Sequence, residues 1–177
     1  MELDPSLYGP VAAELLHLAG FPSRRMTLVI GDCTATAVRS RLKQRASAVF
    51  PDAAAPEAAL SGLYLYISCF EDSHTIAQDI HTADGSYWHA ILHRQEPDAG
   101  NASYWFHRVG SHPIFPALAA EAETLRYPTA SKWDPVQFIA YCEKARHSGK
   151  KDQVALATAV QHAEWQLLFH HCARPQE

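Results

Sequence analysis

Residues 62–82 read GLYLYISCFEDSHTIAQDIHT, and this stretch decides the fold class that the sequence predicts. Apolar side chains occupy most positions from Leu63 to Ile80, so a helix formed here is apolar around nearly its whole circumference. Such a helix belongs in the interior of a protein, because a surface helix keeps one polar face. We therefore predict a central apolar helix around residues 62–82, surrounded by the rest of the chain.

Further helices are expected on both sides of this central segment. Pro97 ends a short helix that Ser86 caps, and Asp134-Pro135 opens another by placing an N-cap residue before proline. Only residues 26–30 show a brief extended pattern, and there is no internal repeat. The sequence thus predicts an all-α fold, a single-domain helical bundle. The other expected helices cover residues 11–18, 34–50, 101–109, 113–125, 134–147 and 152–172.

The size and composition of the chain fit one globular domain. Its 177 residues, of which 47% are hydrophobic and 19% charged, suffice for one ordinary core and are short for two. A chain of this composition can bury enough apolar surface to fold, unlike a disordered one. We expect residues 1–177 to form that single domain.

Charge and hydropathy exclude several classes of partner. The net charge is −4 and no basic run is longer than two residues, so we expect neither nucleic acid nor an anionic membrane surface as a partner. No apolar stretch approaches the roughly 18 residues of a membrane span, and the N-terminus lacks a signal-peptide pattern. The sequence therefore predicts a cytoplasmic protein.

The cysteines predict the same kind of compartment. Cys33, Cys69, Cys142 and Cys172 lie far apart and form no Cys-x-x-Cys pair. In a chain of this length, that pattern is typical of reduced and mostly buried thiols in a reducing environment. We expect all four to be structural.

Histidine is the unusual component of this sequence, since six of its eleven histidines lie between residues 71 and 112. Glu71, His74, Gln78 and His81 follow one another at i, i+3, i+7 and i+10, which places them on one stripe of the expected central helix. Buried imidazoles and carboxylates must be hydrogen-bonded, ion-paired or bound to a metal. We therefore expect polar partners to face this stripe.

The next expected helix supplies such partners. His89, His93 and Glu96 stand at i, i+4 and i+7, so two imidazoles and a carboxylate face the same way. Side chains of these types bind divalent transition metals. We predict a metal site with His74, His89, His93 and Glu96 as ligands, and with Glu71 as a further ligand or the catalytic general base. A two-metal site is not favoured, because these two helices hold a single Glu-x-x-His pair.

Aromatic and hydrogen-bonding residues are interleaved around this expected metal site. Such a mixture can line a pocket in which a ring stacks and polar groups orient a small molecule. Asn101, Tyr104 and Arg108 share one helix face, where the arginine and the amide suit an anionic or hydroxylated substrate. The alternative is that the tryptophans belong to the core and the charged residues form exposed ion pairs. The predicted substrate-binding residues are Trp88, Arg94, Asn101, Tyr104 and Arg108.

Three functions stay open at this point. The first is a metal-dependent enzyme that acts on a small polar molecule, and the second is a metal-free protein that binds a small molecule in the same pocket. The third is a structural or interaction protein in which the histidines and carboxylates satisfy each other in a buried network. The sequence contains no Gly-rich phosphate loop and no Gly-x-Ser-x-Gly elbow, so it gives no support to nucleotide-loop or serine-hydrolase chemistry.

Residues 87–110, YWHAILHRQEPDAGNASYWFHRVG, resemble a family of small bacterial and fungal proteins. That family carries a similar YWH-x3-HR-x-EPD-x2-N-x2-YWF-x-RVG stretch, and the tail EWQLLF at residues 164–169 is also similar to it. The resemblance covers about two thirds of the chain, beginning near Gly62. Because the family is uncharacterised, the resemblance implies no activity.

Overall fold

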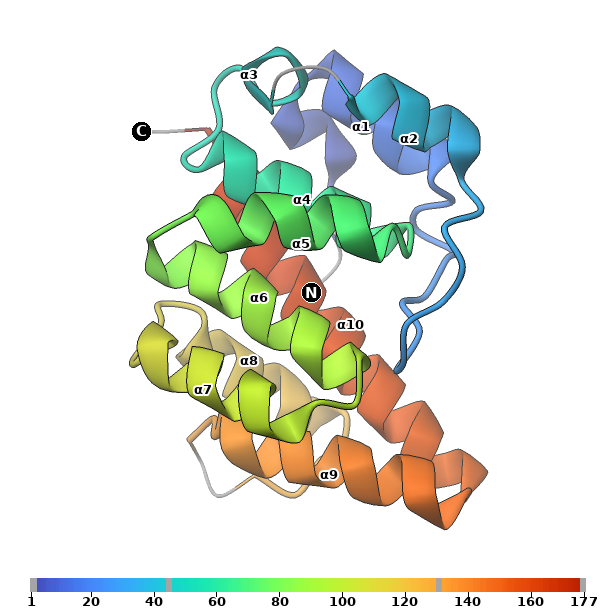
Figure 1. Ribbon diagram of the computed structural model, residues 1–177, viewed down its shortest axis with the longest axis vertical. Coiled ribbons are helices and arrows are strands. Elements are labelled where there is room, and N and C mark those ends of the chain that lie inside the picture. Colours follow the sequence, from blue (N-terminus) through green and yellow to red (C-terminus); the bar gives the residue numbers. More distant parts are fainter. Residues whose placement is uncertain (1–2, 44–45, 130–131, 176–177) are drawn as a thin grey trace.

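The computed structural model describes residues 3–43, 46–129 and 132–175. Within these ranges the chain forms ten α-helices, one short 3-10 helix and no β-strand, which confirms the all-α fold class (Figure 1). The described residues contain one isolated β-bridge, between Ala53 and Pro175. The elements are η1 (Pro5–Tyr8), α1 (Pro10–Leu18), α2 (Thr36–Leu42), α3 (Ala46–Val49), α4 (Pro56–Tyr66), α5 (Phe70–Asp79), α6 (Ala83–Gln95), α7 (Ala99–Val109), α8 (Phe115–Thr124), α9 (Pro135–Ser148) and α10 (Lys151–Ala173).

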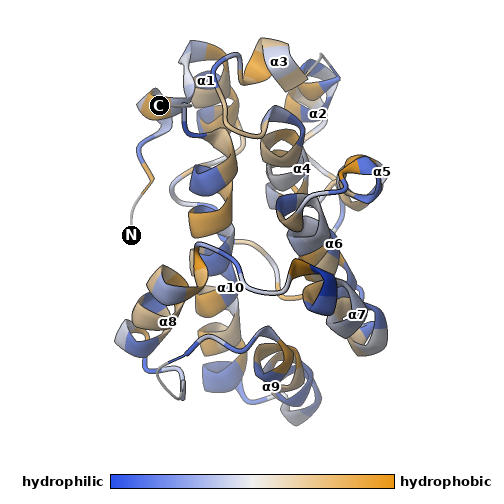
Figure 2. Cartoon of the chain, turned by 90° about the vertical axis from the view of Figure 1, so that its left-hand side faces the viewer, coloured by the Kyte–Doolittle hydropathy of each residue, from blue (hydrophilic) through white to orange (hydrophobic). Residues whose placement is uncertain are grey.

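The helices are arranged around the long helix α10. In Figure 2, α10 stands beside a layer formed by α4, α6 and α7, with α1 to α3 at one end of the molecule and α8 and α9 at the other. The larger core cluster joins α1, α4, α6 and the C-terminal half of α10. A smaller cluster, which includes Leu118, Phe138 and Val160, lies where α8 and α9 pack on the N-terminal half of α10.

The predicted continuous helix over residues 62–82 is wrong, because the chain breaks it into α4 and α5. Helix α4 ends at Tyr66, Ser68 has a φ of 61°, and α5 begins at Phe70. The all-round apolar pattern stops at this point, and a straight continuation would carry Glu71 and Asp72 into the core. Of these two helices, α4 is the central one, since every residue from Ala58 to Tyr66 is buried.

Helices α4 and α6 approach each other closely at Gly62. A Cβ atom at this position would lie 2.6 Å from Cζ2 of Trp88, so any larger residue would collide with the indole. The carbonyl of Gly62 also accepts a hydrogen bond from Nε1 of Trp165 on α10, at 2.8 Å. Glycine is therefore required here by packing.

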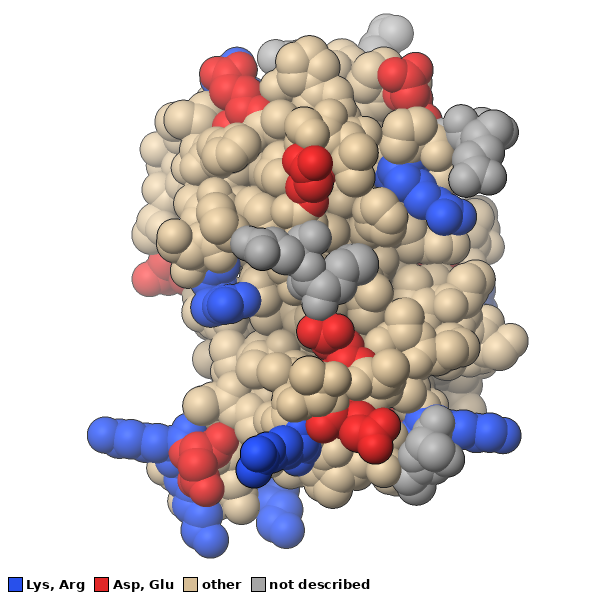
Figure 3. All heavy atoms as spheres, turned by 180° about the vertical axis from the view of Figure 1, so that it is seen from behind, with Lys and Arg blue, Asp and Glu red and all other residues tan. Residues whose placement is uncertain are grey.

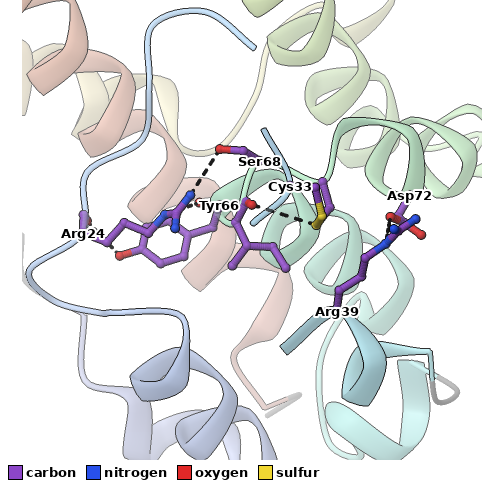
Figure 4. Close-up of a disulfide and its surroundings, with 8 residues drawn as sticks. Arg24, Cys33, Arg39, Tyr66, Ser68 and Asp72 are labelled. Atoms are coloured by element: carbon purple, nitrogen blue, oxygen red, sulfur yellow. Dashed lines mark hydrogen bonds and ion pairs between the residues drawn. A yellow bond between two sulfur atoms is a disulfide. The ribbon is translucent and has the colours of Figure 1, made fainter. Parts of the chain in front are cut away.

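The strap of residues 22–35 crosses α4 and α10 without forming a strand. Arg24 donates to the carbonyl of Tyr66 at 3.1 Å and to Oγ of Ser68 at 3.2 Å (Figure 4). The carbonyl of Thr27 accepts from the side-chain amides of Gln95 and Gln161, each at 2.7 Å. Residues 26–30, which suggested a short extended segment, are therefore held by hydrogen bonds from side chains and not by pairing with another strand.

The prediction of four reduced thiols is wrong for one pair. Cys33 in the strap and Cys69 before α5 form a disulfide with a Cα–Cα distance of 4.5 Å (Figure 4). Cys142 and Cys172 are free and buried, as expected. The sequence contains no hint of the pair, because the two residues are 36 positions apart and no motif joins them.

Charged side chains are dispersed over the face shown in Figure 3. Acidic residues occur along the length of this face, and the basic side chains extend mainly from the end formed by α9 and the start of α10. None of the described helices is both long enough and apolar enough to cross a membrane.

Candidate metal centre

Three of the predicted ligands meet between α5 and α6. His74 comes from α5, and His89 and His93 come from successive turns of α6. Nε2 of His74 and Nε2 of His89 are 3.0 Å apart, and one ring nitrogen from each of the three side chains lies within 4.8 Å of the others. Three imidazole nitrogens at this spacing can converge on one cation.

A pair of serines positions His74. Ser73 donates through Oγ to the carbonyl of Ser61 at 2.8 Å, and Ser61 donates in return to the carbonyl of Ser73 at 3.1 Å. This exchange fastens α5 onto α4, with Ala77 buried one turn further along α5. His74, the next residue, then faces α6, and its ring meets those of His89 and His93 at centroid distances of 4.6 and 5.6 Å.

Burial and two neighbouring histidines favour the neutral form of His89. Its ring lies on the indole of Trp105, from α7, with ring centroids 3.9 Å apart. Burial, together with the neighbouring His74 and His93, lowers the pKa of His89 to about 4. A neutral imidazole keeps a lone pair on nitrogen, which is the form that binds a metal. Nδ1 of His89 is buried without a partner in the described part of the chain, so the ring is oriented by its stacking on Trp105 and by the contact of its Nε2 with His74.

Glu96 contacts the ring of His93 at Nδ1. Its Oε2 lies 3.0 Å from Nδ1 of His93, and the side-chain amide of Asn101 lies 3.4 Å from the same nitrogen. Nε2 is therefore the nitrogen of His93 that remains available to a metal. Carboxylates commonly bind the outer nitrogen of a metal-ligating histidine in this way and strengthen it as a ligand. Glu96 thus lies beside the group of three histidines whose ring nitrogens converge, and it contacts that group through His93.

The expected polar stripe on residues 71–81 does not face the protein interior. Glu71, Gln78 and His81 are exposed, and Glu71 lines a shallow surface hollow with Tyr64 and Thr75. After the break at Ser68, α5 lies at the outer edge of the molecule (Figure 2). Among the described residues of the stripe, it is His74 whose ring meets those of His89 and His93 on α6. Glu71 therefore has no observed contact that supports a role as ligand or general base.

Two of the predicted substrate-binding residues belong to the core. Trp88 is fully buried against Gly62, which confirms the alternative reading for this tryptophan. Arg94 is also fully buried and forms an ion pair with Glu164 of α10. Neither side chain can reach a solvent-borne molecule.

The buried ion pair is completed by two further side chains. Tyr87 donates through its hydroxyl to Oε1 of Glu164 at 3.0 Å, and Arg94 donates to Oε1 of Gln161 at 3.3 Å. The guanidinium also lies over the ring of Phe138, 4.6 Å from its centroid. Sequence reasoning missed Glu164, because a single carboxylate in a long helix gives no signal of burial.

The other three predicted substrate-binding residues lie on α7 beside the histidines. Asn101 reaches His93, and Tyr104 is 55% exposed. The guanidinium of Arg108 lies 5.2 Å from the ring centroid of Trp105 and 6.0 Å from that of Tyr104. A cation and an exposed phenol thus border the indole on which His89 stacks.

A second cluster went unpredicted. Asp84 at the start of α6, His112 before α8 and His171 near the end of α10 bring their side chains together. His112 is the last histidine of the stretch 71–112, but no spacing linked it to Asp84 or to His171. Because the three residues come from distant segments, no spacing rule could have joined them.

The chain matches no protein-family model, and comparisons with curated proteins and with solved structures found no similar protein. The family resemblance of residues 87–110 therefore stays a prediction.

Proposed function

We propose that this protein is a metal-dependent enzyme that acts on a small polar molecule at His74, His89 and His93. The observation that carries the proposal is the convergence of three imidazole nitrogens within 4.8 Å. Three protein ligands leave a fourth tetrahedral position open for water or substrate, which distinguishes catalytic from structural zinc sites. A metal in such a site lowers the pKa of its bound water to about 7 and so supplies a nucleophile at neutral pH.

The surroundings of the histidines favour a substrate with an anionic or hydroxylated group. Arg108 has no ion-pair partner among the described residues, and Trp105 holds its guanidinium beside the histidine cluster. Tyr104 and Asn101 add a hydroxyl and an amide on the same side of α7. A positive charge next to a metal-bound water suits the binding of a carboxylate or phosphate oxygen.

Metal content tests the proposal directly. Protein purified without a histidine tag is analysed for metals before and after treatment with a chelator, together with its melting temperature. We expect at least one metal ion per chain in the wild type and one ion fewer per chain in His93→Ala. The matched control is His107→Ala, because His107 is exposed on the neighbouring helix and binds only the carbonyl of Ser103. Full retention of metal in His93→Ala would contradict the ligand set.

A metal-free binding protein is the second candidate, and the exposed ring of Tyr104 beside Arg108 favours it. In this case a carboxylate or phosphate ligand raises the melting temperature of chelator-treated protein, by the usual linkage between binding and stability. The increase must disappear in Arg108→Ala. The same ligand screen on metal-loaded protein separates the two functions, because the enzyme needs the metal and the binding protein does not.

A further inference from the structure

Asp84, His112 and His171 form a compact cluster away from the first histidine site. The start of α6, the turn between α7 and α8, and the C-terminal part of α10 lie on the same side of the molecule (Figure 1). Oδ1 of Asp84 lies 3.0 Å from Nε2 of His112 and 3.3 Å from Nε2 of His171. All three donor atoms are within 4.8 Å of one another.

The protein interior shapes this cluster. The side chain of His112 is 1% exposed, and its ring packs edge-on against Tyr87, with centroids 5.0 Å apart. Asp84 and His171 are 18% and 25% exposed, so both are partly open to solvent. A cluster with one buried and two partly exposed members can hold an ion that reaches it from solution.

We propose that Asp84, His112 and His171 bind a second divalent transition metal ion, independently of the first site. Two imidazoles and one carboxylate are a donor set that Zn²⁺, Fe²⁺ and Mn²⁺ use, whereas Ca²⁺ and Mg²⁺ prefer oxygen alone. The ion would tie together three segments that are distant in the sequence. Its main effect is then on the stability of the folded state, because a ligand that binds only the native protein stabilises it.

The rival arrangement is a hydrogen-bonded triad without metal. In that case Nε2 of His112 carries the proton and donates it to Asp84, while Nδ1 accepts from the backbone N–H of Ile114. The contact with Ile114 is 3.4 Å, longer than the usual 2.7–3.2 Å, so little is lost when it breaks. Metal binding moves the proton of His112 from Nε2 to Nδ1 and turns both Nε2 lone pairs toward the ion.

Titration of a variant that lacks the first site tests the proposal. His74→Ala/His93→Ala, freed of metal by chelation, is titrated with Zn²⁺ by calorimetry, and its melting temperature is followed. We expect one ion per chain and a rise in melting temperature. Adding Asp84→Asn must abolish both effects, whereas Asp52→Asn, an exposed aspartate away from the cluster, must leave them unchanged.

A second variant keeps the test decisive if Asp84→Asn does not fold. His171→Ala, in the same background, changes the most exposed member of the cluster and must also abolish binding. Absence of Zn²⁺ binding in His74→Ala/His93→Ala, or binding that survives His171→Ala, would overturn the proposal. Either result leaves the proposal for the first site standing, because the metal of that site is measured as the difference between the wild type and His93→Ala.

Discussion

Replacing Gly62 with alanine tests how α4 positions the helix that carries His89 and His93. The new methyl group would lie 2.6 Å from Cζ2 and 2.8 Å from Cη2 of Trp88, where ordinary contacts begin at about 3.4 Å. The indole is fully buried and rigid, so it cannot move aside by a change of rotamer alone. Helix α6 must therefore shift away from α4.

The cost follows from two opposing effects. Inserting a methyl group into a close-packed core costs about 1–3 kcal/mol, and the short contacts with a rigid ring place this site at the upper end. Alanine recovers about 1 kcal/mol of helix propensity relative to glycine. We expect a net loss of about 2 kcal/mol in the free energy of unfolding, or roughly 4–8 °C in melting temperature for a chain of this size. Metal affinity should fall as well, because the shift of α6 moves two ligands away from His74.

Urea denaturation followed by tryptophan fluorescence measures the loss, and zinc titration measures the effect on the site. Gly100→Ala is the matched control, since its Cβ would meet Asp98 at 3.6 Å, an ordinary contact, and the helix gains propensity. Stability of Gly62→Ala at or above the wild-type value would refute the packing argument. A destabilised variant with unchanged metal affinity would refute the link between α4 and the site.

Three further predictions concern the buried charges and histidines. Glu164→Gln leaves the guanidinium of Arg94 buried without a counter-charge and should cost about 3–5 kcal/mol in urea denaturation, so a loss below about 1 kcal/mol would contradict the buried pair. Burial and Arg25 lower the pKa of His162 to about 4, so the unfolded chain takes up a proton near pH 6.5 and the folded chain only near pH 4. Stability is therefore complete above about pH 6.5 and falls toward pH 4, by at most about 1.4 kcal/mol per pH unit for this group. His162→Gln should make the free energy of unfolding less dependent on pH between 4 and 6.5. An identical pH dependence in the variant and the wild type would show that His162 is not its cause. Glu96→Gln should weaken zinc binding about 10–100-fold through His93, and an unchanged Kd in a competition titration would remove Glu96 from the site.

The parts of the fold that local chemistry controls could be predicted from the sequence. Asp134 caps α9 as expected, accepting from the backbone N–H groups of Val136 and Gln137. The start of α6 was misplaced, because Thr82 rather than Ser86 is its N-cap. The expected helix over residues 34–50 is two helices, α2 and α3, and residues 44 and 45 between them lie outside the described residues.

The break between α4 and α5 was beyond sequence reasoning. No proline or glycine marks residues 67–69, and the left-handed backbone falls on Ser68. What ends α4 is tertiary packing, since Tyr66 donates to the carbonyl of Arg24 in the strap at 2.8 Å and stacks on Trp165 at 4.4 Å. Such contacts join residues that local patterns cannot relate.

For the candidate site, helix periodicity correctly predicted which residues of α6 lie together. It could not predict how residues of different helices are placed relative to one another. The i, i+4 spacing placed His89 and His93 together, and the expectation that His74 faces them agrees with the geometry. The same reasoning misplaced Glu71, which depended on an unbroken helix. Periodicity also could not predict that Arg94 points into the core, because its neighbour His93, on the same turn of α6, belongs to the candidate site.

Helix α6 packs against other parts of the protein on every side, and this restricts how its sequence can change. All positions from Gly85 to Gln95 are buried, with Trp88 directed at α4, Arg94 at α10 and His93 at the candidate metal centre. One inserted residue would rotate everything after it by about 100° and exchange these destinations. Insertions and deletions should therefore be excluded from this helix in any functional variant, whereas the exposed turn at Ser148-Gly149 can absorb them.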